Sequence, residues 1–461
     1  MNNLHAAKVE ALKASVQGAV ILPGDEGYEN ARKVWNATID KHPALIVRCA
    51  TTADVVGSVN FAKDNGLVLA VRGGGHNIAG SAICDDGIVV DLSQMKAASI
   101  DAGARRGTVE GGATLADFDA ATQAHGLAVP LGINSTTGVA GLTLGGGFGW
   151  LSRKFGMTID SLESAEVVTA AGDVLRTSAS EHPDLFWALR GGSGNFGVVT
   201  RFEFRLHPVG PEVLSGLIVY PLSEARTVLE RYRDFMDKAP DDLAVWVVLR
   251  KAPPLPFLPE KVHGQGMIAL ALCYAGDPAQ GQPLIEPLRK FGTLWGEHVG
   301  VQPYTAWQQA FDPLLAPGAR NYWKSHNFSS LQDGLFDAVI AFAQTLPSPQ
   351  CEIFFGAIGG ATTRPAPDSA AYAHRDARFV MNVHGRWSDP ADDNRCIGWA
   401  RDFFKASAPF ASGGVYVNFL TADEGDRVKA AYGQNYERLA QIKRQYDPNN
   451  LFCTNQNIKP A

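Results

Sequence analysis

Residues 67–77, LVLAVRGGGHN, decide the fold. The five apolar residues predict a buried strand, and the three glycines after them permit a tight turn with a closely approaching backbone. A glycine-rich turn that follows a strand of an α/β unit lets backbone N–H groups converge on an anion. Phosphate is the usual anion, so the segment predicts a phosphate-binding turn.

The surrounding sequence extends this α/β unit. An apolar strand at 44–50 precedes a helix that Thr52 can cap and that Asn65-Gly66 ends. Seventeen of the chain's 48 glycines lie between Gly73 and Gly149. A second glycine segment, residues 131–149, has hydroxyl groups and bare backbone but almost no charge. One interpretation is that a ligand lies flat along this segment. The alternative interpretation is that the glycines only form tight turns between strands.

A third glycine segment, residues 191–197, contains a formal G-x-G-x-x-G. In a dinucleotide fingerprint this motif opens a helix. Here the alternating sequence VVTRFEFRL follows and predicts a strand instead. The context therefore argues against a Rossmann NAD site.

The composition changes after His207-Pro208. Strands such as LAVWVVLR, MIALALCYA, CEIFFGAIGG and RFVMNVHGRW alternate with helical stretches up to about residue 409. This pattern predicts a second domain, a sheet with helices on one face, whose polar strand residues line a pocket between the domains. An aromatic-rich helix near the end stops at Asp447-Pro448.

Composition excludes several classes of protein. The net charge of the 461 residues is −6, with no basic stripe for a nucleic acid or an anionic membrane. No apolar run reaches the roughly 18 residues of a spanning helix, and the first residues lack the apolar core of a secretory signal. We therefore expect a cytoplasmic protein. The six cysteines show neither a disulfide framework nor a metal-ligand spacing, so we expect no metal site.

Four separated motifs together resemble one family: RGGGHNIAG, GINSTTGVAGLTLGGGFGWLSRKFGMTID, DLFWALRGGSGNFGVVT, and YVNF with YDPNNLFCTNQNI. The chain resembles the berberine-bridge-enzyme-like FAD-linked oxidoreductases of the vanillyl-alcohol-oxidase fold, closest in motifs to bacterial members with one covalent link. The resemblance implies an α+β fold of two domains. It implies a PCMH-type FAD-binding domain over residues 1–207, a substrate domain of an antiparallel sheet covered by helices over 208–409, and a segment 410–461 returning to the first domain.

The resemblance also implies the residues that hold FAD. His76 corresponds to the histidine joined covalently to the 8α-methyl group of the flavin. The other positions fall into four groups: Arg72, Gly73, Gly74, Gly75, Asn77 and Ser81 at the pyrophosphate; Pro130, Gly132, Thr136, Thr137, Gly138, Gly141, Gly145 and Gly146 along the flavin and ribityl chain; Asn195, Gly197 and Val199 toward the adenine; and Tyr416, Asn418 and Gln456 over the flavin.

Many relatives carry a second tether, a cysteine, at the position of Asn134. The resemblance therefore implies attachment through His76 only. Cys84 stands outside the motif position, and we interpret it as a buried structural thiol.

Two catalytic positions of the family carry different residues in this chain. The family often places a tyrosine at the position of Phe419 and a glutamate or glutamine at that of Asn382. Neither residue found here is a base at neutral pH. Glu352, in an apolar strand, is the best candidate, because burial raises a carboxyl pKa toward the range useful for acid–base work. A strand-end glutamate facing solvent is the alternative.

His384 shares a strand face with Asn382 and, like Tyr322, is a further catalytic candidate. A hydrogen-bonded pocket histidine and a core aromatic are the ordinary interpretations of these two residues.

The resemblance implies an oxidase that moves a hydride from a C–H bond of a small molecule, beside oxygen or nitrogen, to flavin N5, with O₂ giving H₂O₂. Three alternatives stay open: an oxygenase of secondary-metabolite tailoring, a dehydrogenase with another acceptor, and a flavin-binding protein without turnover. Aromatic residues favour an apolar or aromatic substrate, and a sugar is the alternative.

Overall fold

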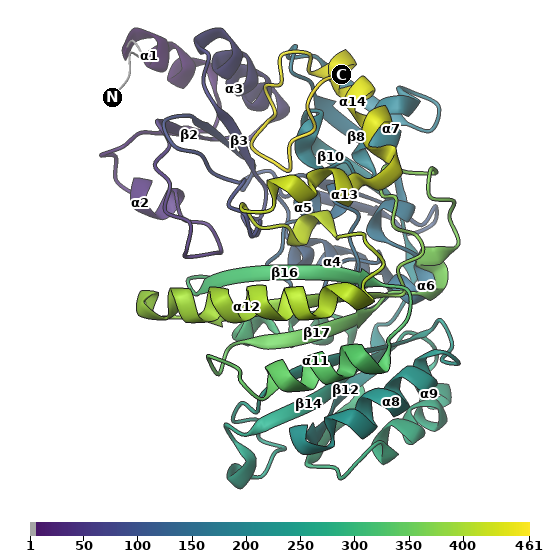
Figure 1. Cartoon of the computed structure of the whole chain (residues 1–461). Helices are drawn as coiled ribbons and strands as arrows, with labels where there is room; N and C mark the ends of the chain where they lie inside the picture. The colour runs from purple at the N-terminus through teal and green to yellow at the C-terminus, as the bar shows by residue number, and fades with distance from the viewer. Residues whose placement is uncertain (1–5) are drawn as a thin grey trace.

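The computed structural model describes residues 6–461, and Figure 1 shows an upper lobe of N- and C-terminal elements above a lobe built on one large sheet. A four-stranded sheet of the upper lobe carries the first glycine turn. Its order is β1 (Ala19–Ile21), β2 (Leu45–Arg48), β4 (Ile88–Asp91) and β3 (Leu69–Arg72), of which β2, β4 and β3 are parallel. The helix α3 (Thr52–Asn65) connects β2 to β3, with Thr51 rather than Thr52 capping it through the N–H of Asp54.

A five-stranded antiparallel sheet lies beside it in the upper lobe. The order is β5 (Ala98–Asp101), β6 (Arg106–Glu110), β10 (Val198–Arg205), β8 (Leu162–Val168) and β9 (Val174–Ser178). The third glycine segment leads directly into β10, so the prediction that a strand follows it is confirmed.

Shorter elements complete the upper lobe and its border with the large sheet. They are α1 (Ala6–Ser15), α2 (Tyr28–Ala31), α4 (Leu115–Gln123), β7 (Leu127–Ala128), α5 (Val139–Leu144), α6 (Ser152–Phe155), α7 (Pro183–Leu189) and β11 (His207–Pro208). The helix α5 begins inside the second glycine segment, so that segment is only partly loop.

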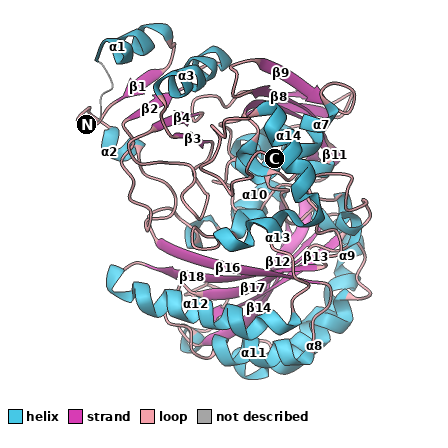
Figure 2. Cartoon of the chain, turned by 45° about the horizontal axis from the view of Figure 1, so that its top comes forward, coloured by secondary structure: helices cyan, strands magenta, loops and turns pink. Residues whose placement is uncertain are grey.

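The large sheet has seven antiparallel strands. Their order is β15 (Gly296–Pro303), β12 (Glu212–Pro221), β14 (Gly266–Tyr274), β13 (Leu243–Lys251), β17 (Glu352–Ala357), β18 (Phe379–Trp387) and β16 (Arg320–Phe328). As Figure 2 shows, α8 (Ala225–Met236), α11 (Asp333–Ala343) and α12 (Asp393–Ser407) cover one face. The helices α9 (Pro278–Ile285) and α10 (Tyr304–Gln309) lie against β12. The predicted α+β class, with an antiparallel sheet covered by helices, is confirmed.

The C-terminal segment returns to the upper lobe. The helices α13 (Val428–Tyr432) and α14 (Tyr436–Tyr446) are yellow in Figure 1, and α14 packs on α7. The fully buried Lys443 donates to Asp447 and to the main-chain oxygens of Asn195 and Phe452. A buried ammonium group needs such partners. We propose the division into residues 1–207, 208–409 and 410–461, which this packing supports.

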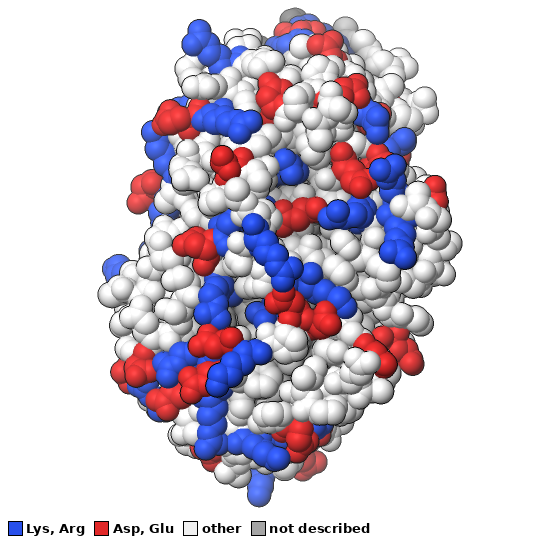
Figure 3. Space-filling view, turned by 90° about the vertical axis from the view of Figure 1, so that its right-hand side faces the viewer, with Lys and Arg blue, Asp and Glu red and all other residues white. Residues whose placement is uncertain are grey.

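The surface carries both signs of charge. On the face drawn in Figure 3, acidic and basic side chains are interspersed. This distribution differs from the single basic stripe typical of a nucleic-acid-binding face. Among the helices of residues 6–461, none has the length and apolarity that crossing a bilayer requires.

Candidate active site

A cavity lies between the glycine-rich loops of the upper lobe and the uncovered face of the large sheet. The loop side consists mainly of residues 73–77, 132–141 and 193–199. The sheet side consists mainly of alternate residues of β13, β14, β17 and β18, because successive side chains of a strand point to opposite faces, with Leu217 of β12 and Trp323 of β16 beside them. Residues 416–419 and 455–456 of the C-terminal segment contribute a third side.

Two glycines let the loops meet on the upper-lobe side. A Cβ placed on Gly74 would lie 2.3 Å from the main-chain nitrogen of Gly138, and one placed on Gly138 would lie 2.4 Å from that of Gly74. Side-chain atoms cannot approach backbone so closely, so both positions require glycine. By contrast, a Cβ on Gly141 would meet open space at the cavity. Some glycines of the segment thus bring loops together, and others leave room for a ligand.

His76 lies on the loop side of the cavity. Its Nε2 is 2.8 Å from the hydroxyl oxygen of Thr136, and its ring stacks on Trp35 with the ring centroids 5.0 Å apart. Burial, and then the charge of Arg386, lower the pKa of His76 to about 4. The imidazole is therefore neutral at neutral pH.

A row of polar groups crosses the opposite, sheet side. The strand register places Arg250, Glu352 and His384 directly beside one another on β13, β17 and β18. A guanidinium nitrogen of Arg250 donates to Glu352 at 2.8 Å, and His384 Nδ1 lies 3.4 Å from the other carboxylate oxygen. His384 Nε2 lies 3.0 Å from the amide oxygen of Asn321. These groups form one buried chain of charged and polar side chains.

The charge state of Glu352 differs from the sequence-based expectation. Burial raises the pKa of Glu352, but Arg250, then His384 and Arg386, lower it further, and the result lies below the usual value. The expected raised pKa is therefore wrong, because the sequence did not reveal two arginines beside this carboxyl group. Glu352 is ionised at neutral pH, the state of a proton acceptor.

Three aromatic side chains, Trp246, Trp323 and Phe354, line the cavity on the sheet side beside aliphatic ones. Trp246 and Phe354 stack with centroids 5.8 Å apart and planes at 5°. Trp323 packs edge-on against His384 and Phe419 at 5.0 and 5.3 Å. Such flat apolar surfaces suit a flat apolar ligand.

Most sequence-predicted residues line this cavity. Among the candidate catalytic residues, Glu352, Asn382 and His384 do. The predicted cofactor residues that line it are Gly73, Gly74, Gly75, His76, Asn77, Ser81, Gly132, Thr137, Gly138, Gly141, Gly197, Val199, Tyr416, Asn418 and Gln456.

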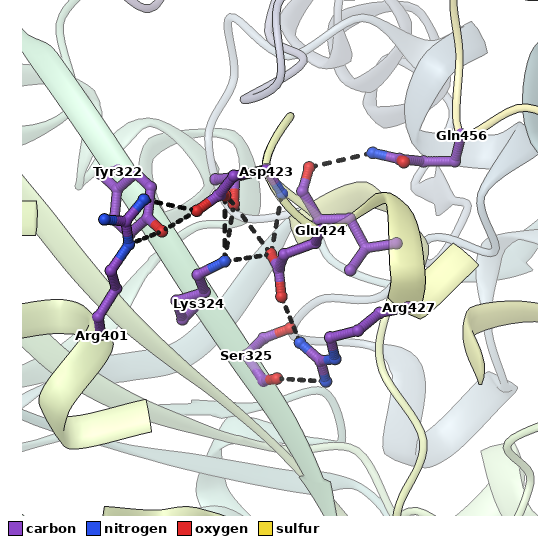
Figure 4. Close-up of polar contacts among 10 residues, drawn as sticks. Tyr322, Lys324, Ser325, Arg401, Asp423, Glu424, Arg427 and Gln456 are labelled. Atoms are coloured by element: carbon purple, nitrogen blue, oxygen red, sulfur yellow. Dashed lines mark hydrogen bonds and ion pairs between the residues drawn. The ribbon is translucent and has the colours of Figure 1, made fainter. Parts of the chain in front are cut away.

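Tyr322 is not among the lining residues, and its catalytic assignment is corrected. Its neighbour Trp323 lines the cavity, so Tyr322 points to the other face of β16. Its hydroxyl donates to Asp423 at 2.6 Å and accepts from Arg401 at 2.9 Å, as Figure 4 shows. Burial and the Asp423 carboxylate raise the pKa of Tyr322. Together with Lys324, it fixes the C-terminal segment to the edge of the sheet.

Arg72 also needs correction as a pyrophosphate ligand. Its guanidinium donates to the fully buried carboxylate of Asp91 at 2.6 Å and to the main-chain oxygen of Ala31. Burial raises the pKa of Asp91, but Arg72 and the hydrogen bonds from Ser93 together lower it below its usual value. Arg72 therefore holds β3, β4 and the α2 region together, and the glycine backbone is left to meet an anion.

Asn195 does not line the cavity either, because its side chain makes hydrogen bonds inside the protein. Its amide nitrogen donates to the main-chain oxygens of Gly192 and Gln456, and its oxygen accepts the N–H of Ile458. It connects the third glycine segment to the C-terminal segment. Four further predicted cofactor residues are not among the residues that line the cavity: Pro130, Thr136, Gly145 and Gly146.

Sequence reasoning missed Trp35 and Arg250, which both line the cavity. Trp35 lies in an irregular segment without a pattern that could have identified it. Arg250 had a signal, because it shares a strand face with Trp246 and Val248 in the sequence LAVWVVLR.

The two lobes and the glycine-lined cavity define a flavin-binding protein, and comparisons with known proteins agree. Residues 43–178 match the model of an FAD binding domain, and residues 415–459 match the model named berberine and berberine like. An FAD-linked oxidoreductase of Dictyostelium discoideum is 31% identical over 97% of this chain and 95% of its own length. The chain belongs to the berberine-like family of FAD-linked oxidoreductases, and it is an oxidoreductase.

Two further similarities concern oxidases of 6-hydroxynicotine. (R)-6-hydroxynicotine oxidase of Paenarthrobacter nicotinovorans is 31% identical, with 98% of each chain covered. The solved structure of 6-hydroxy-D-nicotine oxidase from Arthrobacter nicotinovorans superposes with a TM-score of 0.88 at 30% identity, covering 97% of this chain and 99% of that one.

The cavity fits FAD. Glycine backbone on the loop side offers N–H groups to phosphate, and the open space at Gly141 leaves room for a flat ring or chain. On the sheet side, both polar atoms of the buried Asn382 amide lack a hydrogen-bond partner among the described residues. A buried amide in this state is expected to meet a polar group of a ligand.

The contact between Gly74 and Gly138 yields a prediction. In Gly138→Ala, the added Cβ forces the two loops apart, so we expect the purified protein to carry less FAD per chain. Flavin released by denaturation and normalised to protein measures this. Gly57→Ala is the matched control, since open space surrounds a Cβ there in α3. It should keep its FAD and gain about 0.5–1 kcal/mol in stability. Equal FAD in both variants would contradict the prediction.

Proposed function

We propose that the protein is an oxidase of small, flat, aromatic alcohols or amines, with O₂ as electron acceptor and H₂O₂ as second product. One observation carries the proposal: His76 on the loop side faces the polar row of the sheet side across the cavity. The ring of Trp35 lies between the two sides. Its centroid is 5.0 Å from that of the His76 ring and 6.4 Å from that of the His384 ring. A ligand between these sides would touch a cofactor anchor and an ionised carboxylate together.

We further propose that FAD is attached covalently, through His76 only. The neutral imidazole is available as a nucleophile, and Asn134 occupies the position of the second tether. When bound, the flavin accepts a hydride and passes electrons to O₂. The main-chain N–H groups of residues 73–77 and the side chain of Asn418, all from residues that line the cavity, would bind and orient it.

Glu352 is the proposed proton acceptor. An ionised carboxylate can take the proton from a substrate hydroxyl or ammonium group as hydride leaves the neighbouring carbon. Arg250 and His384 fix its position from both sides. The aromatic side chains around it exclude water, which strengthens these interactions.

The aromatic cavity surface supports the proposed class of substrate. Trp246, Phe354 and Trp323 offer ring faces and edges, while the polar row supplies charge at one end. Similarity to oxidases of 6-hydroxynicotine agrees with a ring that carries an amine. A sugar, the alternative substrate, would need more hydroxyl partners than these aromatic side chains provide.

Substrate turnover tests the proposed function. A panel of aromatic amines and alcohols is mixed anaerobically with the protein, beside an oligosaccharide set. We expect an aromatic compound to bleach the yellow flavin, and air to restore it with one H₂O₂ per product. Oxygen retained in the product would indicate an oxygenase, and slow O₂ use with fast dye reduction a dehydrogenase. No bleaching across the panel would contradict catalysis of this kind.

The environment of Glu352 predicts a pH effect. Its lowered pKa keeps it ionised well into the acidic range, so kcat/KM should fall only at low pH. In Arg250→Leu, Glu352 stays buried but loses the positive charge that lowers its pKa most. The acidic limb of the kcat/KM profile should therefore move to higher pH. Lys251→Leu, which removes a charge from the opposite face of the same strand, should leave the limb in place. An unchanged limb in Arg250→Leu would argue against Glu352 as the base.

Covalent attachment predicts that acid precipitation leaves the yellow colour in the protein pellet. In His76→Ala the colour should move to the supernatant, since no bond remains. Colour in the wild-type supernatant would refute attachment, and colour retained by His76→Ala would assign it to another residue.

A further inference from the structure

The turn at residues 134–136 bonds to His76 in a way that orients its ring. We propose that Asn134 and Thr136 are positioning residues that hold the proton on Nε2 of His76 and so direct Nδ1 to the flavin. This inference rests on the proposed attachment of FAD through His76.

The direction of each hydrogen bond follows from its partners. The backbone N–H of Thr136 lies 3.1 Å from Oδ1 of Asn134, so this atom is the acceptor. Oδ1 is also 2.8 Å from the hydroxyl oxygen of Thr136, and that hydroxyl must therefore donate its one hydrogen to it. The same hydroxyl oxygen, 2.8 Å from Nε2 of His76, can then only accept. Nε2 of the imidazole consequently carries the proton.

A neutral imidazole holds one proton, so the lone pair is on Nδ1. Burial and the nearby Arg386 charge lower the pKa of His76 and disfavour a second proton. Stacking on Trp35 fixes the plane of the ring, and the indole N–H of Trp35 is itself held by the main-chain oxygen of Leu315 at 2.8 Å. Plane, tautomer and rotation of the imidazole are thus all set by side chains of this protein.

The covalent step joins His76 to the 8α-carbon of FAD and oxidises this pair of groups by two electrons. A C–N bond forms between Nδ1 and the 8α-carbon of FAD, and the 8α-methyl C–H bond breaks with loss of its proton. The Nε2 proton also leaves, because alkylated imidazole is neutral without it. The two electrons released reduce the flavin and pass to O₂, which takes up two protons to form H₂O₂.

Asn134 stands at the position that corresponds to the second tether. Where relatives place a cysteine for a second bond, this chain places an amide whose oxygen already accepts two hydrogen bonds from Thr136. The same site in the loop therefore supports the histidine bond instead of adding another.

Thr136→Val and Asn134→Leu test the proposal on the full protein. For each variant, total flavin and acid-stable flavin are measured after purification and during incubation with added FAD in air. We expect both variants to bind FAD but to attach it roughly tenfold more slowly, about the effect of one hydrogen bond. Thr136→Ser restores the hydroxyl and should restore the rate.

Ser135→Ala is the matched control. Ser135 lies between the two residues, but its hydroxyl bonds to Asp312 and not to His76. It should attach FAD as the wild type does. A loss of rate in Ser135→Ala equal to that in Thr136→Val would show damage to the turn and overturn the proposal.

The flavin peptide gives a second measurement, independent of rate. NMR of the peptide released by proteolysis identifies the nitrogen bonded to the flavin, and we expect Nδ1 in the wild type and a mixture in Thr136→Val. Linkage through Nε2 in the wild type, or variants identical to it in rate and linkage, would overturn the proposal. Absence of acid-stable flavin in the wild type would instead refute the attachment on which it rests.

Discussion

The backbone contact between Gly74 and Gly138 is the constraint on which the site depends. It places the turn after β3 against the start of α5, closer than any pair of residues with side chains allows. Because of this contact, the hydroxyl group of Thr136 reaches the ring of His76. Gly74 and Gly138 meet the requirement for close packing of the loops. Nearby Gly141 has open space where a side chain would lie, so it leaves room for a ligand along the cavity.

Charge is distributed unequally between the two sides of the cavity. On the loop side, Arg72 is paired with Asp91 inside the fold, and backbone groups remain as the means of meeting phosphate. On the sheet side, Arg250 and His384 surround Glu352. A buried carboxylate without such partners would take up a proton. The pairing therefore keeps this carboxylate ionised in surroundings that would otherwise neutralise it.

The sequence predicted the features that depend on local pattern. Strand β3 with its glycines, the strand after residue 197 and the strands carrying Glu352 and His384 follow from apolar runs and alternation. The raised pKa of Glu352, the catalytic role of Tyr322 and the ligand role of Arg72 failed. Each depended on a partner brought close by folding, namely Arg250, Asp423 and Asp91. Trp35 was missed for the same reason, since no neighbouring residue in the sequence indicates its stack on His76.

The C-terminal segment acts as a fixed part of the cavity. At one end, Lys324 on β16 binds Asp423 and Glu424, as Figure 4 shows. At the other, buried Lys443 binds Asp447. Ahead of both in the sequence, Tyr416 accepts the N–H of Gly147 and packs against Phe148. Opening this segment would expose or unpair two buried ammonium groups, which is costly. Ligand entry that left the segment in place would avoid this cost, and the aromatic surface over the cavity would stay ordered through turnover.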